Sequence, residues 1–352
     1  MLENFSKQQL ESLLIFPERG QFDKSYKNIK EFYQIQNDFE IKTYKHYLPF
    51  NSFQYLEKLN FLISSFIWSF YGVKKVKKIL GSKDVIMTRT HWVAYFASKY
   101  SNLIVYECHK FSKIDKFIFN RIANKKNVVL VFPNKTLKKS YKLNKKLNNN
   151  SLILNSSFEE SFFQNIKVDR NTNRVVFVGS LLRFNELRNV SFLIDVFSDI
   201  RLEKFELIVV GGPIKVVEEL KKKINSKNVK FIGPIPQKEA VREILKSDIG
   251  ILINYDDIHS KFHTSPIKYF EYLRGGVKVL AVNYPSHIQL PLNENNYYFE
   301  PNDKESFIQN ILKASNATFS QNDEINKFSY ENRVKKLLNH LARLEGLEPP
   351  TL

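Results

Sequence analysis

A short segment, residues 263–280, combines residue types that could bind a phosphorylated ligand. Ser265 is a favoured N-cap residue and Pro266 suits the first turn of a helix, so their spacing predicts a helix start here. The free N–H groups and the positive dipole end of a helix start attract a diphosphate. Glu271 follows Pro266 by five residues, which is about 7–8 Å along a helix axis. At that distance its carboxylate could accept hydrogen bonds from ribose hydroxyls while the diphosphate lies at the helix start.

An ordinary surface helix would explain the same residues. Ser-Pro begins many helices, and Lys268, three residues before Glu271, could form a common surface ion pair with it. The helix is predicted to end at Gly275 and Gly276, ahead of a strand. The segment taken alone leaves both interpretations open.

The elements that would position this segment alternate along the second half of the chain. Short apolar runs predict strands at 175–179, 205–211, 229–233, 249–253 and 277–282. Amphipathic stretches between them predict helices at 190–198, 214–224, 237–246 and 266–274. This order predicts parallel βαβ units in an α/β fold, with ligands beyond the carboxyl ends of the strands.

The first half of the chain shows a similar but less regular alternation. Strands are predicted at 13–16, 39–44, 84–88, 103–107, 128–132 and 152–154, with a long helix at 53–80. The polar stretch 159–172 suits a linker between two domains. A chain of 352 residues is long enough for two such domains.

The motifs of the second half, taken in order, resemble glycosyltransferase family 4, which has the GT-B fold. Ser265-Pro-x-Lys268-x-x-Glu271-Tyr272, followed by two glycines and a strand, is similar to the donor-site signature of that family. Further segments resemble other family motifs in the expected order: 177–181, 188–190, 207–212, 229–234 and 328–331. The resemblance covers residues 150–345 well and the first half only loosely.

This resemblance implies roles for particular residues. Glu271 would bind the ribose of a nucleotide, and the amides around Pro266 and Lys268 would hold its diphosphate. Arg183 and Arg188 are the candidates for the basic pair that stabilises the leaving diphosphate in place of a metal. The donor pocket would comprise Gly179, Ser180, Gly211, Pro234, His263, Ser265, Pro266, Ile267, Lys268 and Glu271.

Two features depart from the family pattern. His263 stands eight residues before Glu271, where many members have a second glutamate, so its contact with the donor sugar is an open point. The loop at 182–187 is longer than usual, which leaves the choice between Arg183 and Arg188 open. Arg188 also replaces a lysine, which keeps the charge and changes the geometry.

A histidine in the first half is a further catalytic candidate. His109 follows Glu107 at the end of a predicted strand, and in the family a histidine near this point approaches the transferred sugar. A structural histidine is the alternative interpretation. For His91 the structural interpretation is favoured.

The net charge of +18 is concentrated in the first half, where residues 51–150 hold 20 Lys/Arg against 4 Asp/Glu. The four lysines between Lys74 and Lys78 follow an aromatic run at 61–73, a combination that suits an anionic membrane surface. A buried helix with a solvated basic end is the alternative. Nucleic acid is not expected, because no recognised binding motif accompanies the charge. With one cysteine, Cys108, and no signal peptide or spanning segment recognised, we expect a cytoplasmic protein, peripheral at the inner face of the membrane.

The sequence therefore predicts a GT-B glycosyltransferase with two Rossmann-like domains facing a cleft. We expect an acceptor-side domain at 1–165, a nucleotide-sugar donor domain at 166–318, and a crossover helix with the tail at 319–352. The resemblance implies a retaining transfer, with no metal or other cofactor, from a nucleotide-diphosphate sugar to a saccharide or lipid-linked acceptor of a surface polysaccharide such as capsule or lipopolysaccharide. A non-catalytic partner protein and a nucleotide-sugar epimerase on the same scaffold are the alternatives.

Overall fold

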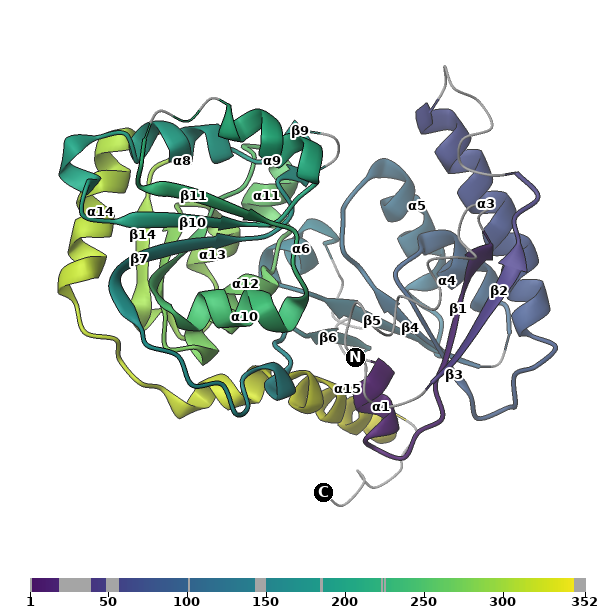
Figure 1. Ribbon diagram of the computed structural model, residues 1–352. Helices are drawn as coiled ribbons and strands as arrows, with labels where there is room; N and C mark the ends of the chain where they lie inside the picture. Colours follow the sequence, from purple (N-terminus) through teal and green to yellow (C-terminus); the bar gives the residue numbers. More distant parts are fainter. Residues whose placement is uncertain are drawn as a thin grey trace. The chain divides into compact units, whose positions relative to one another are not determined.

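The computed structural model describes residues 2–18, 39–48, 57–100, 102–142, 150–183, 186–222, 224 and 226–344. The chain forms two compact units (Figure 1). The first unit comprises Met1–Leu154 together with Val334–Leu352, and the second comprises Asn155–Arg333.

The second unit is built on a six-stranded parallel sheet. Its strands are β7 (Asn171–Val178), β10 (Glu206–Val210), β11 (Val229–Gly233), β12 (Ser247–Leu252), β13 (Lys278–Val282) and β14 (Asn296–Phe299). They lie in the order β11-β10-β7-β12-β13-β14. The chain therefore builds the sheet outward from β7, first to one side and then to the other, and the order reverses between β7 and β12. The five predicted strands are confirmed, and β14 is an additional one.

Helices cover both faces of this sheet. Alternate strand residues point to opposite faces, so each strand supplies two separate hydrophobic clusters. One face packs against α8 (Val190–Val196), α9 (Ile214–Lys221) and α14 (Lys304–Asn316). The other packs against α10 (Gln237–Leu245) and α12 (Ile267–Arg274). This is a doubly wound layer arrangement, and the four predicted helices are confirmed to within a few residues. Shorter helices are α11 (Ile258–Phe262) and α13 (Pro285–Ile288).

The first unit contains a four-stranded parallel sheet in the order β3-β4-β5-β6. These strands are β3 (Val85–Thr88), β4 (Leu103–Glu107), β5 (Val128–Phe132) and β6 (Ser151–Ile153), and β1 (Leu13–Glu18) pairs separately with β2 (Glu40–Lys45). All six predicted strands are confirmed. The helices are α1 (Leu2–Ser6), α3 (Glu57–Val76), α4 (His91–Ala97), α5 (Lys113–Ile122) and α6 (Lys135–Ser140). Among the helices that the structure describes, none has the length and apolar composition needed to cross a bilayer.

The last helix, α15 (Tyr330–Leu344), ends in the first unit. Leu337 and Leu341 pack with Val105 and Val129 of that unit's sheet. The predicted return of the C-terminal helix to the first unit is therefore observed.

The boundary between the units differs from the prediction. Residues 155–165 belong to the second unit, because Phe158 is fully buried in its core and its backbone pairs with that of Ser329. Phe162 is buried as well, so the predicted linker is partly a structural segment. For the same reason the second unit extends to Arg333 instead of ending at residue 318.

Candidate functional site

The carboxyl edge of the second unit's sheet carries closely packed glycine-rich turns. Gly211, directly after β10, has φ of +139°, and a Cβ added there would lie 1.8 Å from the carbonyl oxygen of Gly179, which follows β7. Only glycine fits this close backbone approach. Next to it, the ring of Pro234 lies 3.2 Å from the position that a Cβ on Gly212 would take. Ser180 donates a hydrogen bond of 2.7 Å from its hydroxyl to the carbonyl of Leu182. The turns after β7, β10 and β11 thus form one continuous loop surface.

Helix α12 begins beside this edge, but not with the predicted cap. The helix starts at Ile267 with Pro266 as its N-cap residue. The Oγ of Ser265 instead accepts a hydrogen bond of 2.9 Å from the backbone N–H of Ser156. The prediction of Ser265 as the N-cap was therefore wrong, because its side chain ties the incoming chain to the start of α12. The predicted helix end is confirmed, with Gly276 in the left-handed region at φ of +68°.

Glu271 of α12 lies in a buried polar cluster. Its side chain is 1% exposed; Oε1 accepts a hydrogen bond of 3.0 Å from Nε2 of Gln237, and Oε2 pairs with the ammonium group of Lys268. The surface-pair interpretation of Lys268 and Glu271 does not hold, since the pair is largely buried. Gln237 is the first residue of α10 and was not predicted as a site residue. The sequence signal that could have identified Gln237 is its position just after the 229–234 motif.

Tyr272, the neighbour of Glu271, fills the point where the strand order reverses. Its hydroxyl accepts a hydrogen bond from the N–H of Val178 in β7 and donates one to the carbonyl of Ile251 in β12, both at 3.3 Å. A Cβ on Gly250 of β12 would lie 2.6 Å from the Tyr272 ring, so glycine makes room for it. The phenol joins the two central strands where ligands bind in such sheets.

Arg188 lies over the turn after β7. Its Nη1 atom is 3.2 Å from the position that a Cβ on Gly179 would take. Burial raises the pKa of the Tyr272 hydroxyl; the charge of Glu271 raises it further, whereas Arg188 lowers it. Arg188 and Glu271 therefore both lie within electrostatic range of the same hydroxyl.

Arg183, the second basic candidate, lies in a short hairpin. Strand β8 (Leu182–Arg183) pairs with β9 (Glu186–Leu187), and Arg183 stands opposite Glu186. The long loop predicted at 182–187 is thus a two-stranded projection. The side chain of Arg183 lies outside the described residues, so only Arg188 is placed at the site.

His263 lies at the turn between α11 and α12. It is the C-cap residue of α11, is 6% exposed, and its ring contacts that of His259 edge to face at 5.7 Å. Burial lowers the pKa of His263, and the charge of Asp257 opposes this only in part. Its imidazole is therefore neutral near pH 7, unlike the glutamate of the family pattern.

A second polar cluster occupies the carboxyl end of β4 in the first unit. Glu107, whose side chain is 2% exposed, accepts hydrogen bonds from Nε of Arg89 at 2.8 Å and from Nε2 of His109 at 3.2 Å. Arg89 was not predicted as a site residue, because it comes from a different strand end. His91 pairs through Nδ1 with the buried Asp115 at 2.7 Å, as a structural histidine does.

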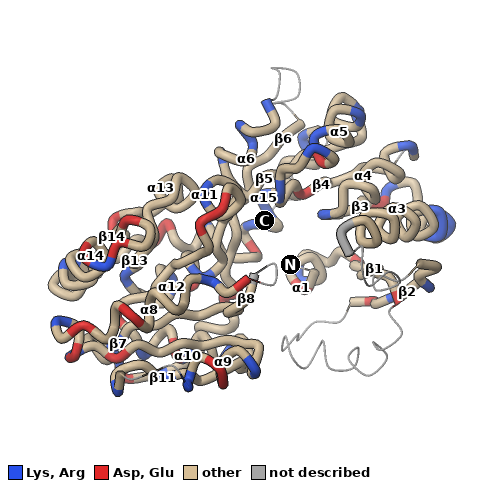
Figure 2. The backbone as a smooth tube through the Cα atoms, turned by 90° about the horizontal axis from the view of Figure 1, so that it is seen from above, with Lys and Arg blue, Asp and Glu red and all other residues tan. Residues whose placement is uncertain are grey.

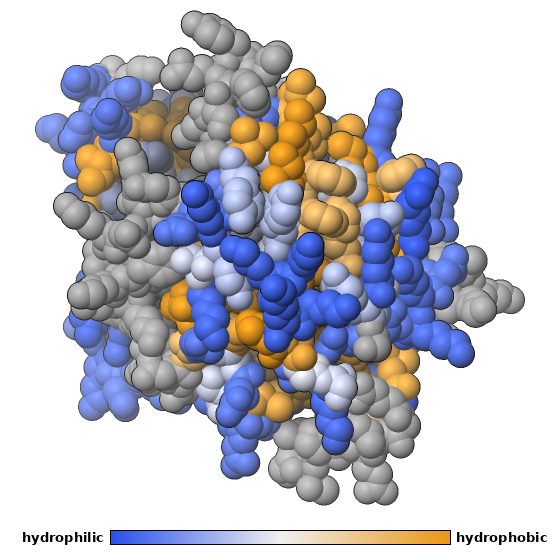
Figure 3. All heavy atoms as spheres, turned by 90° about the vertical axis from the view of Figure 1, so that its right-hand side faces the viewer, coloured by the Kyte–Doolittle hydropathy of each residue, from blue (hydrophilic) through white to orange (hydrophobic). Residues whose placement is uncertain are grey.

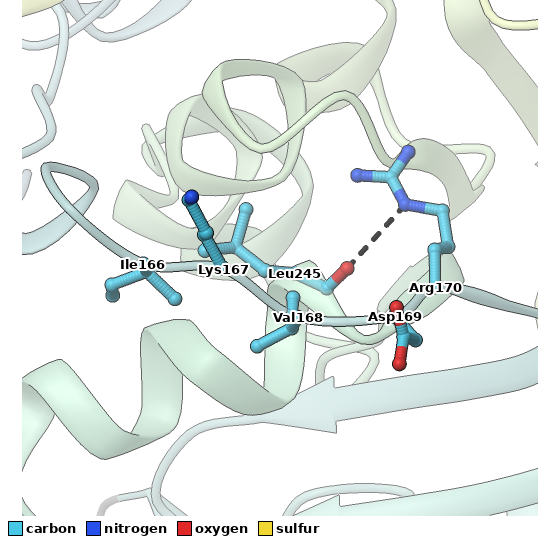
Figure 4. A pocket seen from close by; sticks show the side chains of 6 residues that line it. All are labelled: Ile166, Lys167, Val168, Asp169, Arg170 and Leu245. Carbon is cyan, nitrogen blue, oxygen red and sulfur yellow. Dashed lines mark hydrogen bonds between the residues drawn. The ribbon is translucent and has the colours of Figure 1, made fainter.

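A cavity lies at the opposite edge of the second unit's sheet. It has a volume of about 500 Å³ and is lined by residues 166–170 and Leu245 (Figure 4). Arg170 donates a hydrogen bond of 3.4 Å to the carbonyl of Leu245 and also binds the carbonyls of Gly275 and Gly276. This cavity borders the amino ends of β7 and β12, away from Glu271. In the described parts of the chain, no group of three or more His, Cys, Asp or Glu side chains is arranged to hold a metal.

The class of the second unit follows from a family comparison. Residues 172–316 match the family model described as glycosyl transferases group 1. The match supports a glycosyltransferase with the GT-B fold, and its span contains Arg188, Gln237 and Glu271. No curated protein matches the sequence significantly.

Solved structures resemble the chain over almost its whole length. HepE of Anabaena, in complex with UDP and glucose, has a TM-score of 0.65 at 15% identity, covering 97% of this chain and 94% of that one. Sucrose-phosphate synthase from Thermosynechococcus elongatus has a TM-score of 0.70 at 11% identity, covering 98% and 92%. The UDP-forming alpha,alpha-trehalose-phosphate synthase of Burkholderia vietnamiensis has a TM-score of 0.60 at 8% identity, covering 96% and 100%. At these identities the likeness shows the fold, which is GT-B.

Proposed function

We propose that the protein is a family 4 glycosyltransferase that uses a UDP-sugar donor. The observation that carries this proposal is the buried Glu271 of α12, bonded to Gln237 and Lys268 beside Tyr272, which joins β7 and β12 at the strand-order reversal. Support for UDP comes from HepE, which has the same fold and was solved with UDP and glucose.

The donor would lie along the carboxyl edge of the second unit's sheet. First-turn amides of a helix have no partner inside the helix, so those of Ile267 and Lys268 suit the diphosphate. A carboxylate offers about four acceptor positions, and Gln237 and Lys268 use two of those on Glu271. Ribose hydroxyls would take the others. The base would lie near Pro234, and His263 would lie near the donor sugar.

The chemistry would be the departure of UDP as an acceptor hydroxyl attacks the anomeric carbon. Negative charge builds on the leaving diphosphate, and Arg188, which lies over the turn after β7, would stabilise it. We propose that the sugar is transferred with retention and without a metal. His109, held by Glu107, would approach the transferred sugar from the first unit.

The acceptor would be a lipid-linked saccharide in surface polysaccharide synthesis, reached by peripheral association with the inner face of the membrane. The excess of Lys and Arg at 51–150 supports this, because it lies in the unit that does not carry the donor site. A non-catalytic partner protein on the same fold would bind UDP and release none from a UDP-sugar, and an epimerase would convert the donor without releasing UDP.

The test is UDP binding by calorimetry to the wild type and to Glu271→Ala. We expect binding at least about fivefold weaker, or about 1 kcal/mol, because charged hydrogen bonds to ribose are lost. Glu243→Ala is the matched control, since Glu243 is another largely buried, ion-paired glutamate but lies toward the amino ends of the strands, beside Ser247 of β12. Equal UDP affinity in wild type and Glu271→Ala would remove Glu271 from the site. Failure of the wild type to release UDP from a UDP-sugar in the presence of saccharide acceptors would refute the transferase.

A further inference from the structure

Helix α3 leaves several of its large apolar side chains exposed to solvent. Its buried positions include Asn60, Ser64 and Ser69, each 0% exposed, and Ser64 donates a hydrogen bond to Asn60 at 3.2 Å. Val73 is buried in the core of the first unit, and Leu62, Ile67 and Trp68 are half-buried. Six other large apolar side chains of the helix are 41–50% exposed: Leu59, Phe61, Ile63, Phe66, Phe70 and Tyr71. A helix of a globular domain ordinarily turns most of its apolar residues toward the core, so this exposed apolar surface is large for one helix.

Four of the exposed apolar residues form one continuous stripe that leads into lysines. Leu59, Ile63, Phe66 and Phe70 follow the spacing of three and four that places residues on one side of a helix. The same side continues through Lys74 to Lys77, both exposed. Three turns of apolar side chains thus lead directly into positive charge. We call these six residues, with Lys78 just after the helix, the α3 face.

The aromatic part of the α3 face is held in place by the first unit. Phe66 contacts the rings of Trp92 at 4.9 Å and Phe96 at 5.3 Å, both from α4, and Phe70 contacts Phe96 at 5.4 Å. These edge-to-face contacts fix the rings while leaving them partly exposed. The face is therefore presented as a preformed surface.

Positive charge predominates around the α3 face. Lys74, Lys77 and Lys78 are exposed, and Lys75 lies 5.1 Å from the Tyr44 ring centre. Figure 2 shows blue segments, which are Lys and Arg, at one end of α3. Figure 3, which faces the right-hand side of Figure 1, shows an apolar band with strongly hydrophilic residues beside it. Residues 51–150 carry a net charge of +16. An occupant must accept aromatic side chains and be negatively charged.

We propose that the α3 face docks on an anionic lipid bilayer, with its aromatic and aliphatic side chains in the headgroup layer and its lysines on acidic headgroups. This rests on the proposed function, which needs access to a lipid-linked acceptor. Aromatic residues beside lysines are typical of such interfaces, and lysines near an anionic surface bind it reversibly. A second copy fits less well, because it would bring two strongly cationic units together.

The experiment is flotation of the full chain with vesicles of phosphatidylcholine alone and with a third of phosphatidylglycerol. We expect at least tenfold more binding to the anionic vesicles at low salt, falling several-fold at 0.5 M salt. The apolar variant Leu59→Ser with Ile63→Ser and the charge variant Lys74→Glu with Lys78→Glu should each reduce binding at least tenfold. The control Ile200→Ser with Ile232→Ser removes two exposed apolar residues of the second unit and should bind as wild type.

The outcomes separate this proposal from the proposed function. UDP affinity is measured on every variant in the absence of vesicles, and it should equal that of the wild type. Equal binding to neutral and anionic vesicles, or none to either, overturns the docking proposal even if UDP still binds. Analytical ultracentrifugation tests whether the face is instead a contact between copies. If the wild type forms a dimer and does not bind vesicles, and the apolar variant is a monomer, the docking proposal is overturned.

Discussion

Glu271 of the second unit and Lys74 of the first show two different uses of charge. Glu271 is buried, its oxygens bonded to Gln237 and Lys268, and the residues at 171–352 are nearly balanced, with 25 Lys/Arg against 22 Asp/Glu. Lys74 is exposed at the end of an apolar stripe, in a region with a large cationic excess. One unit holds charge in a buried local network, and the other presents an excess of positive charge at its surface.

Because of this difference, a substitution or a change of pH should affect the stability of one unit more than that of the other. Both tryptophans, Trp68 and Trp92, lie in the first unit, so tryptophan fluorescence reports on that unit alone. Circular dichroism reports on both. Comparison of the two signals shows whether a substitution in one unit also alters the stability of the other unit.

The largest expected effect is that of Gly211→Ala. The new Cβ would collide with the Gly179 carbonyl, and the backbone angle of Gly211 is unfavourable for alanine, so the second unit should lose about 4 kcal/mol or more. Urea unfolding should show the dichroism transition shifting while the fluorescence transition stays. Gly81→Ala, which meets only ordinary contacts at 3.6 Å, is the control. If both transitions shift together, the two units unfold as one, which contradicts the expectation that a substitution in one unit leaves the stability of the other unchanged.

The next largest effect is expected for Arg188→Ala, which tests whether Arg188 contributes to catalysis. We expect the rate of UDP release to fall about 100- to 1,000-fold, or roughly 3–4 kcal/mol, because stabilisation of the leaving diphosphate is lost. Steady-state kinetics with a soluble acceptor provide the measurement. Lys74→Glu with Lys78→Glu should leave that rate unchanged, and a similar loss in both variants would contradict the division of roles.

Acid should weaken the two units in different pH windows. Burial lowers the pKa of His287 in the second unit to about 4, despite its hydrogen bond to the carbonyl of Val282. The unfolded chain binds this proton below about pH 6.5, so stability falls by about 3 kcal/mol between pH 6.5 and 4.

In the first unit, Asp115 should add a loss of stability at lower pH. Burial raises the pKa of Asp115, but hydrogen bonds from His91 and Ser112 outweigh it, and the pKa lies below its ordinary value. The stability that Asp115 contributes is therefore present above about pH 3.9 and lost below it. Burial also lowers the pKa of His340 in the first unit, but His340 is less buried than His287. Urea midpoints by dichroism should therefore fall more than those by fluorescence between pH 6.5 and 4, and the fluorescence midpoints should fall further below pH 4. His287→Gln should reduce the dichroism slope between pH 6.5 and 4, and if it does not, the assignment to His287 is wrong.

The smallest expected effect sharpens the role of Tyr272. Tyr272→Phe leaves the Val178 N–H and the Ile251 carbonyl without this partner, which should cost about 1–2 kcal/mol of stability and raise the donor KM a few-fold. Tyr269→Phe is the matched control, because Tyr269 is an equally buried tyrosine of α12 that binds the carbonyl of Leu292. It should cost stability without changing the donor KM. The same KM in both variants would make Tyr272 purely structural.

Much of the fold could be predicted because apolar periodicity reports burial directly. The strands at the centres of both sheets are continuous apolar runs, as in β5, where every residue is buried. β14 was missed because its four residues begin with an asparagine and two tyrosines, and three of them are only partly buried. The unit boundary was misplaced because residues 155–165 appear polar in sequence, whereas Phe158 reaches the core through contacts with Phe163 and Phe328.

The candidate site could be predicted only where a motif is local. Glu271 and Lys268 lie within one helix, so their spacing is visible in the sequence. Gln237 lies 34 residues from its partner Glu271, and their contact depends on how α10 packs against α12. Arg89 lies 18 residues from Glu107 and meets it only because β3 pairs with β4.

The second unit has a further consequence for how the chain can be altered. It is inserted between residues 154 and 334 of the first, and its two ends lie side by side: the N–H of Phe158 donates to the carbonyl of Phe328, the N–H of Tyr330 donates to the carbonyl of Phe158, and Arg333 binds the carbonyl of Asn155. A unit whose entry and exit adjoin can be excised and replaced with little change to its host. A chimera that exchanges the second unit as a whole for the corresponding unit of another protein of this fold should therefore leave the first unit folded.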